Sequence, residues 1–148
     1  MAEQRIMRVL KKDDLDAIVA IDTKITHQNR REYYARKIDT ITDPERSINT
    51  SIVAELDGKA VGFIMGDVYF GEFGIPETSA TIDTLGVDPS IQNKGLASEL
   101  DQFVMNMKAA GVNKVYTLVN WDDFALEKFF SRHKFVPSKR INLEFQMP

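Results

Sequence analysis

The adjoining stretches Ile82-Asp83-Thr84-Leu85-Gly86-Val87-Asp88-Pro89 and Gln92-Asn93-Lys94-Gly95-Leu96-Ala97-Ser98 decide the fold of this chain. The first is an apolar run of the β type that ends at a proline, and the second is a polar loop with one glycine. A helical pattern follows, with apolar residues at Leu96, Leu100, Phe103, Val104 and Met107. This order is typical of a site for an anionic phosphate, because the first amides of a helix lack internal partners and the dipole is positive there. The glycine lets a ligand approach the backbone closely.

Length and composition indicate one ordinary globular domain over residues 1–148, with 43% apolar and 28% charged residues. The net charge of −3 gives no basic footprint for a nucleic acid. The chain has no cysteine and only two histidines, so we expect neither disulfides nor a metal site. No apolar run approaches the roughly 20 residues of a membrane span, and the N-terminus is not signal-like. The expected location is the cytoplasm, without a membrane partner.

The hydrophobic pattern predicts alternating strands and helices. Asp57-Gly58 is a strong hairpin signal. We expect strands at 5–10, 51–56, 60–70, 81–87, 114–119 and 140–146. We expect helices that begin after Asp13 or Asp14, at 31–41, at 95–110 before Gly111, and from a cap at Asp122 or Asp123 through Arg132. The order β-α-α-β-β-β-α-β-α-β predicts an α/β or α+β fold, a mixed sheet with helices on its faces.

The order of elements and the glycine loop together resemble the GNAT superfamily of acetyl-coenzyme A-dependent N-acetyltransferases. The family's signature, Gln/Arg-x-x-Gly-x-Gly/Ala, stands here as Gln92-Asn93-Lys94-Gly95-Leu96-Ala97, and residues 122–135 are similar to the family's next helix. The resemblance covers essentially the whole chain. It implies a mixed, mostly antiparallel central sheet with helices on both faces and a splayed strand pair, and acetyl-coenzyme A as cosubstrate.

The resemblance also implies where the coenzyme lies. Backbone amides of the loop and helix start would cradle the pyrophosphate, through Gln92, Asn93, Lys94, Gly95, Leu96, Ala97 and Ser98. Backbone groups of Leu85 and Val87 would pair with the pantetheine arm, and the Val87 amide could polarise the thioester carbonyl.

Three positions depart from the family's pattern. Phe130 replaces a tyrosine that often protonates the leaving thiolate, Asp122 or Asp123 replaces an asparagine that often binds pantetheine, and Lys134 replaces a glycine. A thiolate of pKa near ~8.5 leaves tolerably without protonation. Phe130 therefore also motivates an alternative, a catalytically silent acyl-coenzyme A-binding module. A longer acyl donor is a further option.

Candidate acceptor residues lie on three segments. Asp83, placed by alternation on the face of Thr81 and Leu85, is either a general base or a buried structural carboxylate. Glu72 and Glu77 could bind a cationic amine or be solvated. The resemblance implies that Arg30, Tyr33 and Tyr34 could form a wall of the acceptor site. Alternatively, one tyrosine packs in the core and the arginines are solvated. The preferred functional hypothesis is thus acetyl transfer to a primary amine of a small molecule or peptide. Dimers are common in the family, so a homodimer is possible.

Overall fold

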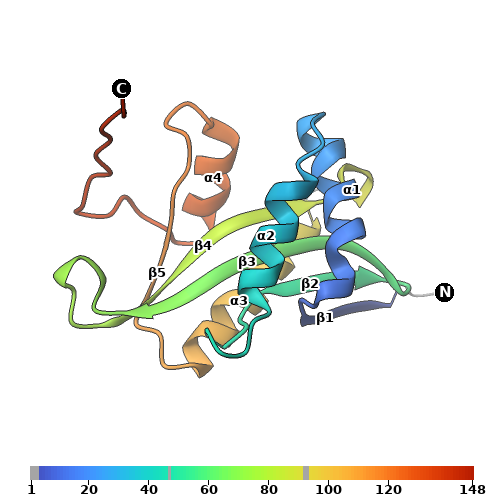
Figure 1. Ribbon diagram of the computed structural model, residues 1–148, viewed down its shortest axis with the longest axis horizontal. Coiled ribbons are helices and arrows are strands. Elements are labelled where there is room, and N and C mark those ends of the chain that lie inside the picture. The colour runs from blue at the N-terminus through green and yellow to red at the C-terminus, as the bar shows by residue number, and fades with distance from the viewer. Residues whose placement is uncertain (1–3, 47, 92–93) are drawn as a thin grey trace. The chain divides into compact units, whose positions relative to one another are not determined.

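The computed structural model describes residues 4–46, 48–91 and 94–148 and divides into two compact units, Met1–Leu118 and Val119–Pro148 (Figure 1). The signature residues Gln92 and Asn93 lie outside the described residues. The expectation of a single domain stays a prediction.

The first unit is built on a five-stranded sheet whose strands lie in chain order. The strands are β1 (Arg5–Val9), β2 (Ile52–Leu56), β3 (Lys59–Phe70), β4 (Thr78–Val87) and β5 (Lys114–Thr117). Neighbours are antiparallel except for β4 and β5, which are parallel. Asp57 and Gly58 both have positive φ angles, 51° and 83°, as a two-residue hairpin turn requires. The predicted mixed, mostly antiparallel sheet is confirmed.

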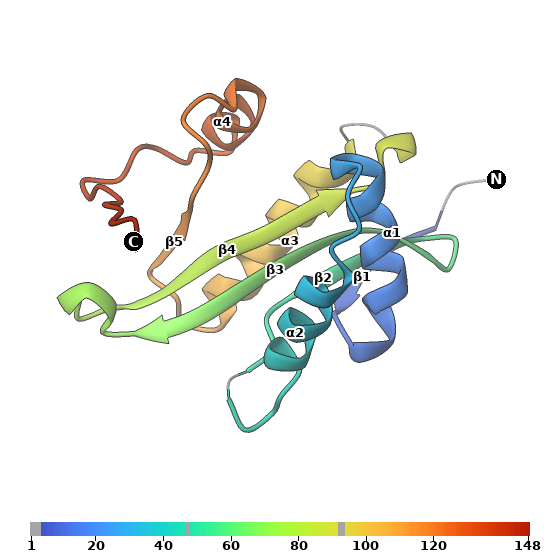
Figure 2. The same cartoon turned by 45° about the horizontal axis from the view of Figure 1, so that its top comes forward.

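Helices α1 (Leu15–Thr26) and α2 (Arg31–Ile41) cover one face of the sheet, and α3 (Lys94–Ala109) covers the other (Figures 1 and 2). The predicted helix at 31–41 is confirmed, and Gly111, with a φ of 82°, follows the end of α3. Short 3-10 turns occur at Lys12–Asp14, Glu72–Gly74 and Pro89–Ile91. No helix in the described part of the chain is both long and apolar enough to cross a membrane.

The core between the sheet and the first two helices follows from helical and strand periodicity. Its buried members are Leu10, Ile18, Val19, Ile21, Tyr34, Ile38, Ile41, Val53, Phe63 and Met65. Those on α2 recur at spacings of four and three residues, so they form one stripe. Asp14 begins α1 without capping it. Its buried carboxylate instead accepts bonds from Arg8 and from the Lys11 amide, 2.9 Å away.

Two glycines of β3 let α3 lie close to the sheet. A Cβ atom at Gly66 would lie 2.6 Å from the Thr81 carbonyl oxygen and against the Phe103 ring, and one at Gly62 would overlap the Glu99 carboxyl. Glu99 and Phe103 are one turn apart on α3, and Gly62 and Gly66 are four residues apart on β3. Each of the two helix side chains therefore lies against one of the two glycines. The Glu99 carboxyl is buried, its oxygens have no hydrogen-bond partner among the described residues, and burial raises its pKa to about 8.

The second unit contains α4 (Phe124–Arg132) and a C-terminal segment without regular structure. Asp123 caps α4 by accepting the Leu126 amide at 3.1 Å. Phe130 is buried, with its ring centroid 5.3 Å from that of Phe129 and 5.0 Å from that of Phe135.

The strand predicted at 140–146 was wrong. Ile141, Leu143 and Phe145 are each more than 80% exposed, and the segment has no regular structure. Alternation indicates which side chains share a face, but a strand also needs a neighbouring backbone with which to bond. The predicted and observed strand ends also differ by a few residues. β4 begins three residues before the predicted residue 81, and β5 ends at Thr117 instead of residue 119.

The buried Glu99 makes the stability depend on pH. The carboxyl has a pKa of 4.5 when unfolded and about 8 when folded, so its contribution is complete below 4.5 and is lost as pH rises toward 8. Glu99→Gln should flatten the pH dependence of the free energy of unfolding. Near pH 8 the variant should be more stable than the native chain by a few kcal/mol, since each pKa unit corresponds to ~1.4 kcal/mol. Urea unfolding between about pH 5 and pH 8 measures it. The exposed Glu45→Gln should parallel the native chain, and a parallel Glu99→Gln curve would contradict this account.

Candidate functional site

The pairing between β4 and the edge strand β5 ends partway along β4. β5 pairs with β4 only from Ser79, opposite Lys114, to Ile82, opposite Thr117. β4 continues to Val87, so no strand of the described residues lies on that side of Asp83 to Val87. Leu85 and Val87 belong to this open edge. Their backbone groups stand where a ligand could pair with β4 as an added strand.

A β-bulge lies at the point of separation. Met65 of β3 pairs with Thr84 and Gly66 pairs with Ile82, so Asp83 is the extra residue on β4. Asp83 and Thr84 consequently both turn toward α2. Asp83 forms an ion pair with Lys37, and the hydroxyls of Thr84 and Tyr33 are 3.1 Å apart.

The predicted common face of Asp83 and Leu85 was wrong for this reason. Leu85 pairs with Ile64, which lies between the core residues Phe63 and Met65 and so faces away from α2. The extra residue shifts the alternation by one, whereas Thr81, before the bulge, pairs with the pocket residue Asp67 and shares the face of Asp83.

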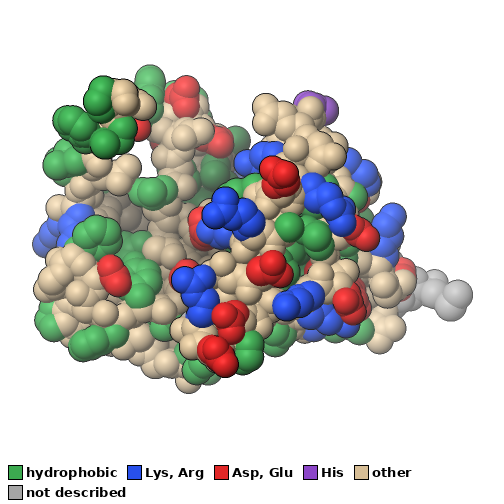
Figure 3. Space-filling view, in the orientation of Figure 1, with side chains coloured by type: hydrophobic (Ala, Val, Ile, Leu, Met, Phe, Trp, Pro, Cys, Tyr) green, Lys and Arg blue, Asp and Glu red, His purple; other side chains and the backbone are tan. Residues whose placement is uncertain are grey.

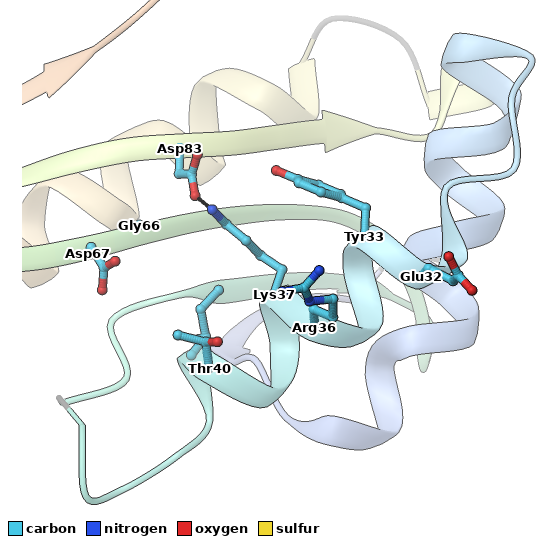
Figure 4. Close-up of a pocket in the computed structure, with 9 residues that line it drawn as sticks. Glu32, Tyr33, Arg36, Lys37, Thr40, Gly66, Asp67 and Asp83 are labelled. Carbon is cyan, nitrogen blue, oxygen red and sulfur yellow. Dashed lines mark ion pairs between the residues drawn. The ribbon is translucent and has the colours of Figure 1, made fainter. Parts of the chain in front are cut away.

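A pocket of about 490 Å³ opens between α2 and the strands at the bulge (Figure 4). Its lining carries three acidic and two basic side chains. The lining residues are Glu32, Tyr33, Arg36, Lys37, Thr40, Ile41, Gly66, Asp67 and Asp83. Figure 4 shows Lys37 reaching from α2 to Asp83, with the Tyr33 ring beside it and Asp67 on the neighbouring strand. Acidic and basic side chains are intermixed over α1 and α2 in Figure 3. The structure thus brings Tyr33 and Asp83 together.

Arg30 and Tyr34 do not line this pocket. Tyr34 is completely buried and donates its hydroxyl to Asp22 at 2.8 Å, and Arg30 binds the same carboxylate through two nitrogens. The Arg30 bond holds the pKa of Asp22 below its ordinary value, while burial raises that of Tyr34. This network ties α1 to α2, so the reading in which one tyrosine packs in the core describes Tyr34.

Glu72 and Glu77 lie at the turn between β3 and β4. Glu77 faces Lys114, with 3.8 Å between the charged atoms, and is six residues from Asp83, or about 20 Å along a strand. Neither glutamate lines the pocket.

Asp88, which the sequence analysis did not select, holds the loop after β4. Its buried carboxylate accepts Lys24 Nζ of α1 at 2.8 Å and the Ser90 amide at 3.0 Å. The bond from Lys24 lowers the pKa of Asp88 to about 2. An aspartate followed by Pro89 and Ser90 is the sequence signal for this turn.

Gly95, in the first turn of α3, is explained neither by packing nor by backbone conformation. A Cβ atom there would meet Val87 Cγ1 at 3.4 Å, which is ordinary van der Waals contact, and its φ is not positive. Leu96, Ala97 and Ser98 continue the turn and are half-buried. Gly95 lies beside the open edge of β4 at Val87, and its role at a ligand site stays a prediction.

The sequence matches the model of the acetyltransferase (GNAT) family over residues 7–135. The chain belongs to this family. The splayed strands, the glycine at the start of α3 and the order of elements are therefore those of an acetyltransferase, and acetyl-coenzyme A is the cosubstrate.

Solved structures share the same fold. Aminoglycoside N-acetyltransferase AAC(6')-Iy, in complex with coenzyme A, superposes with a TM-score of 0.79 at 13% identity, covering 99% of this chain and 97% of that one. A GNAT acetyltransferase from Bacillus cereus ATCC 10987 gives 0.67 at 24% identity, covering 95% and 89%. Ribosomal-protein-alanine N-acetyltransferase from Brucella melitensis biovar Abortus 2308 gives 0.72 at 13% identity, covering 99% and 100%. No curated protein matches the sequence.

Gly95→Glu should abolish coenzyme A binding, because it puts a bulky anion where the pyrophosphate would lie. Gly95→Ala is the matched control for folding, since its Cβ makes only ordinary contacts. Calorimetry with coenzyme A measures the affinity, and saturating coenzyme A should raise the melting temperature of the native chain but not of Gly95→Glu. A folded Gly95→Glu variant with native affinity would refute this site.

Proposed function

We propose that this protein transfers the acetyl group of acetyl-coenzyme A to a primary amine that enters the pocket between α2 and β4. The observation that carries the proposal is that Asp83 belongs both to the pocket and to the open edge of β4. Asp83 lines the pocket and is also the first residue of β4 beyond its pairing with β5. An acceptor in the pocket and a thioester along the open edge would therefore meet at one residue.

The coenzyme arm would pair with the open edge through backbone groups of Leu85 and Val87, and its pyrophosphate would lie at the start of α3. The loop anchored by Asp88 and Lys24 fixes that helix start relative to β4. Much of the rate would come from holding the amine and the thioester carbonyl in line.

The amine must lose a proton to attack, and Asp83 is the proposed base, directly or through one water. Thr84 and Tyr33 position the same end of the pocket through their hydroxyl pair. Phe130 has no hydroxyl, so the thiolate would leave without a proton from that position. Asp123 keeps its cap on α4.

The proposed acceptor is a cationic amine of a small molecule or a peptide. Asp83 and Asp67 supply carboxylates on the two strands that floor the pocket. The structural neighbours named as an aminoglycoside and a ribosomal-protein-alanine N-acetyltransferase both act on nitrogen by name, which supports an amine. A homodimer, a cytoplasmic location and the lack of nucleic-acid or membrane partners stay predictions.

A panel of amines tests the function against the silent-module alternative. Release of free thiol from acetyl-coenzyme A is measured with small polyamines, aminoglycosides and peptides. Turnover with any amine excludes the silent module. Coenzyme A binding without turnover across the panel would favour it, and longer acyl donors run beside acetyl-coenzyme A decide the donor.

Asp83→Asn should lower turnover at saturating substrate by roughly a hundredfold, the usual contribution of a general base, and leave coenzyme A affinity unchanged. Asp67→Asn is the matched control, because Asp67 lines the same pocket on the neighbouring strand but lies within regular pairing. It should weaken acceptor binding and raise KM for the amine, but change turnover at saturating substrate little.

The loss of turnover in Asp83→Asn should hold for acceptors of different pKa, which separates it from the amine's own ionisation. Near-native turnover of a folded Asp83→Asn variant would make Asp83 structural.

A further inference from the structure

Lys37 places a primary amine of the chain itself in the acceptor pocket. Its side chain extends from α2, is about a quarter exposed, and ends in an ion pair with Asp83 (Figure 4). Lys37 is the one lysine among the described pocket residues, and its basic neighbour Arg36 keeps its proton and is no nucleophile.

Two further contacts hold the Lys37 amine at this place. Tyr33 precedes Lys37 by one helical turn on α2. Lys37 Nζ lies 5.9 Å from the centroid of the Tyr33 ring, which is within the range of a cation–π contact. Tyr33 is in turn fixed to β4 by the hydroxyl pair with Thr84. Asp83 and Thr84, which the bulge turns toward α2, therefore each bind a side chain of α2, and Lys37 is the one that Asp83 binds.

We propose that Lys37 is an acceptor of the acetyl group, so that the protein acetylates itself on Lys37 Nζ when no other amine fills the pocket. The inference rests on the proposed function, because it needs the thioester at the open edge of β4 beside Asp83. An external amine must replace the Lys37 ammonium at the same carboxylate. Lys37 is tethered there, so its local concentration exceeds that of any dilute substrate.

The step balances without a further reagent. The Lys37 ammonium gives one proton to Asp83, and its nitrogen lone pair attacks the thioester carbonyl carbon. A C–N bond forms, the C–S bond breaks, and coenzyme A leaves as a thiolate. The nitrogen gives up its second proton as the amide forms, the thiolate takes up one proton, and Asp83 returns the other to solvent. The products are acetyl-lysine, coenzyme A and one proton.

Other lysines with known partners lack this arrangement. Lys24 is bound to Asp88 at the loop after β4, and Lys114 faces Glu77 at the far end of the strand. Lys108, exposed in the last turn of α3, is on the opposite face of the sheet. Lys108 therefore reports the background reaction of an ordinary surface lysine.

The test is incubation of the full chain with acetyl-coenzyme A alone, followed by peptide mass spectrometry over time. Lys37 should gain one acetyl group at least about tenfold faster than Lys108. Its first-order rate constant should not change with protein concentration, because donor and acceptor belong to one molecule. Lys37→Arg, which keeps the charge beside Asp83, should lose this fast phase, and Lys108→Arg should keep it.

Asp83→Asn should slow acetylation of Lys37 and leave that of Lys108 unchanged. Modification of Lys37 no faster than Lys108, or at a rate that grows with protein concentration, would overturn the inference. Turnover of external amines without fast Lys37 acetylation refutes the inference alone. Failure to bind coenzyme A, with no turnover and no fast phase, refutes the proposed function as well.

Discussion

The structure depends on the unequal pairing of β4, which is bonded to β3 along its length but to β5 over only four residue pairs. A strand in the middle of a sheet normally satisfies its backbone groups on both sides. Beyond Ile82, among the strands that the structure describes, β4 has a neighbour only on the β3 side. The bulge occurs at the same point and adds a residue where the strand has lost a neighbour. Both features act on Asp83, so backbone pairing and side-chain direction change together there.

The second constraint is the depth at which α3 meets the sheet. Gly62 and Gly66 remove the side chains that would hold the helix away, and Glu99 and Phe103 fill the space. This packing brings Gly95 into reach of Val87, so the helix N-terminus stands at the end of the open edge. Asp88 ties the connecting loop to α1 from the other side of the sheet. This close contact also buries the Glu99 carboxyl, which has no hydrogen-bond partner among the described residues.

Much of the fold could be predicted because its signals are local. Asp57-Gly58 and Gly111 specify backbone conformations, and the spacing of Tyr34, Ile38 and Ile41 indicates one helix and its buried face. The glycine loop predicts the coenzyme end of the site, and that placement stays a prediction. The acceptor end was less predictable, since the bulge depends on the register between two strands and period-two alternation cannot reveal it. Arg30 and Tyr34 resembled site residues in sequence, but their common bond to Asp22 comes from the packing of α1 on α2. The segment 140–146 had the right alternation and no adjacent strand.

That C-terminal segment has a consequence for the behaviour of the chain in solution. Ile141, Leu143, Phe145 and Met147 stand at every second position of a segment without regular structure and are all mostly exposed. A row of exposed apolar side chains on a segment without regular structure is one of the features from which intermolecular strand pairing grows. Association of concentrated protein through this segment would therefore be opposed by substituting charged side chains for its apolar ones.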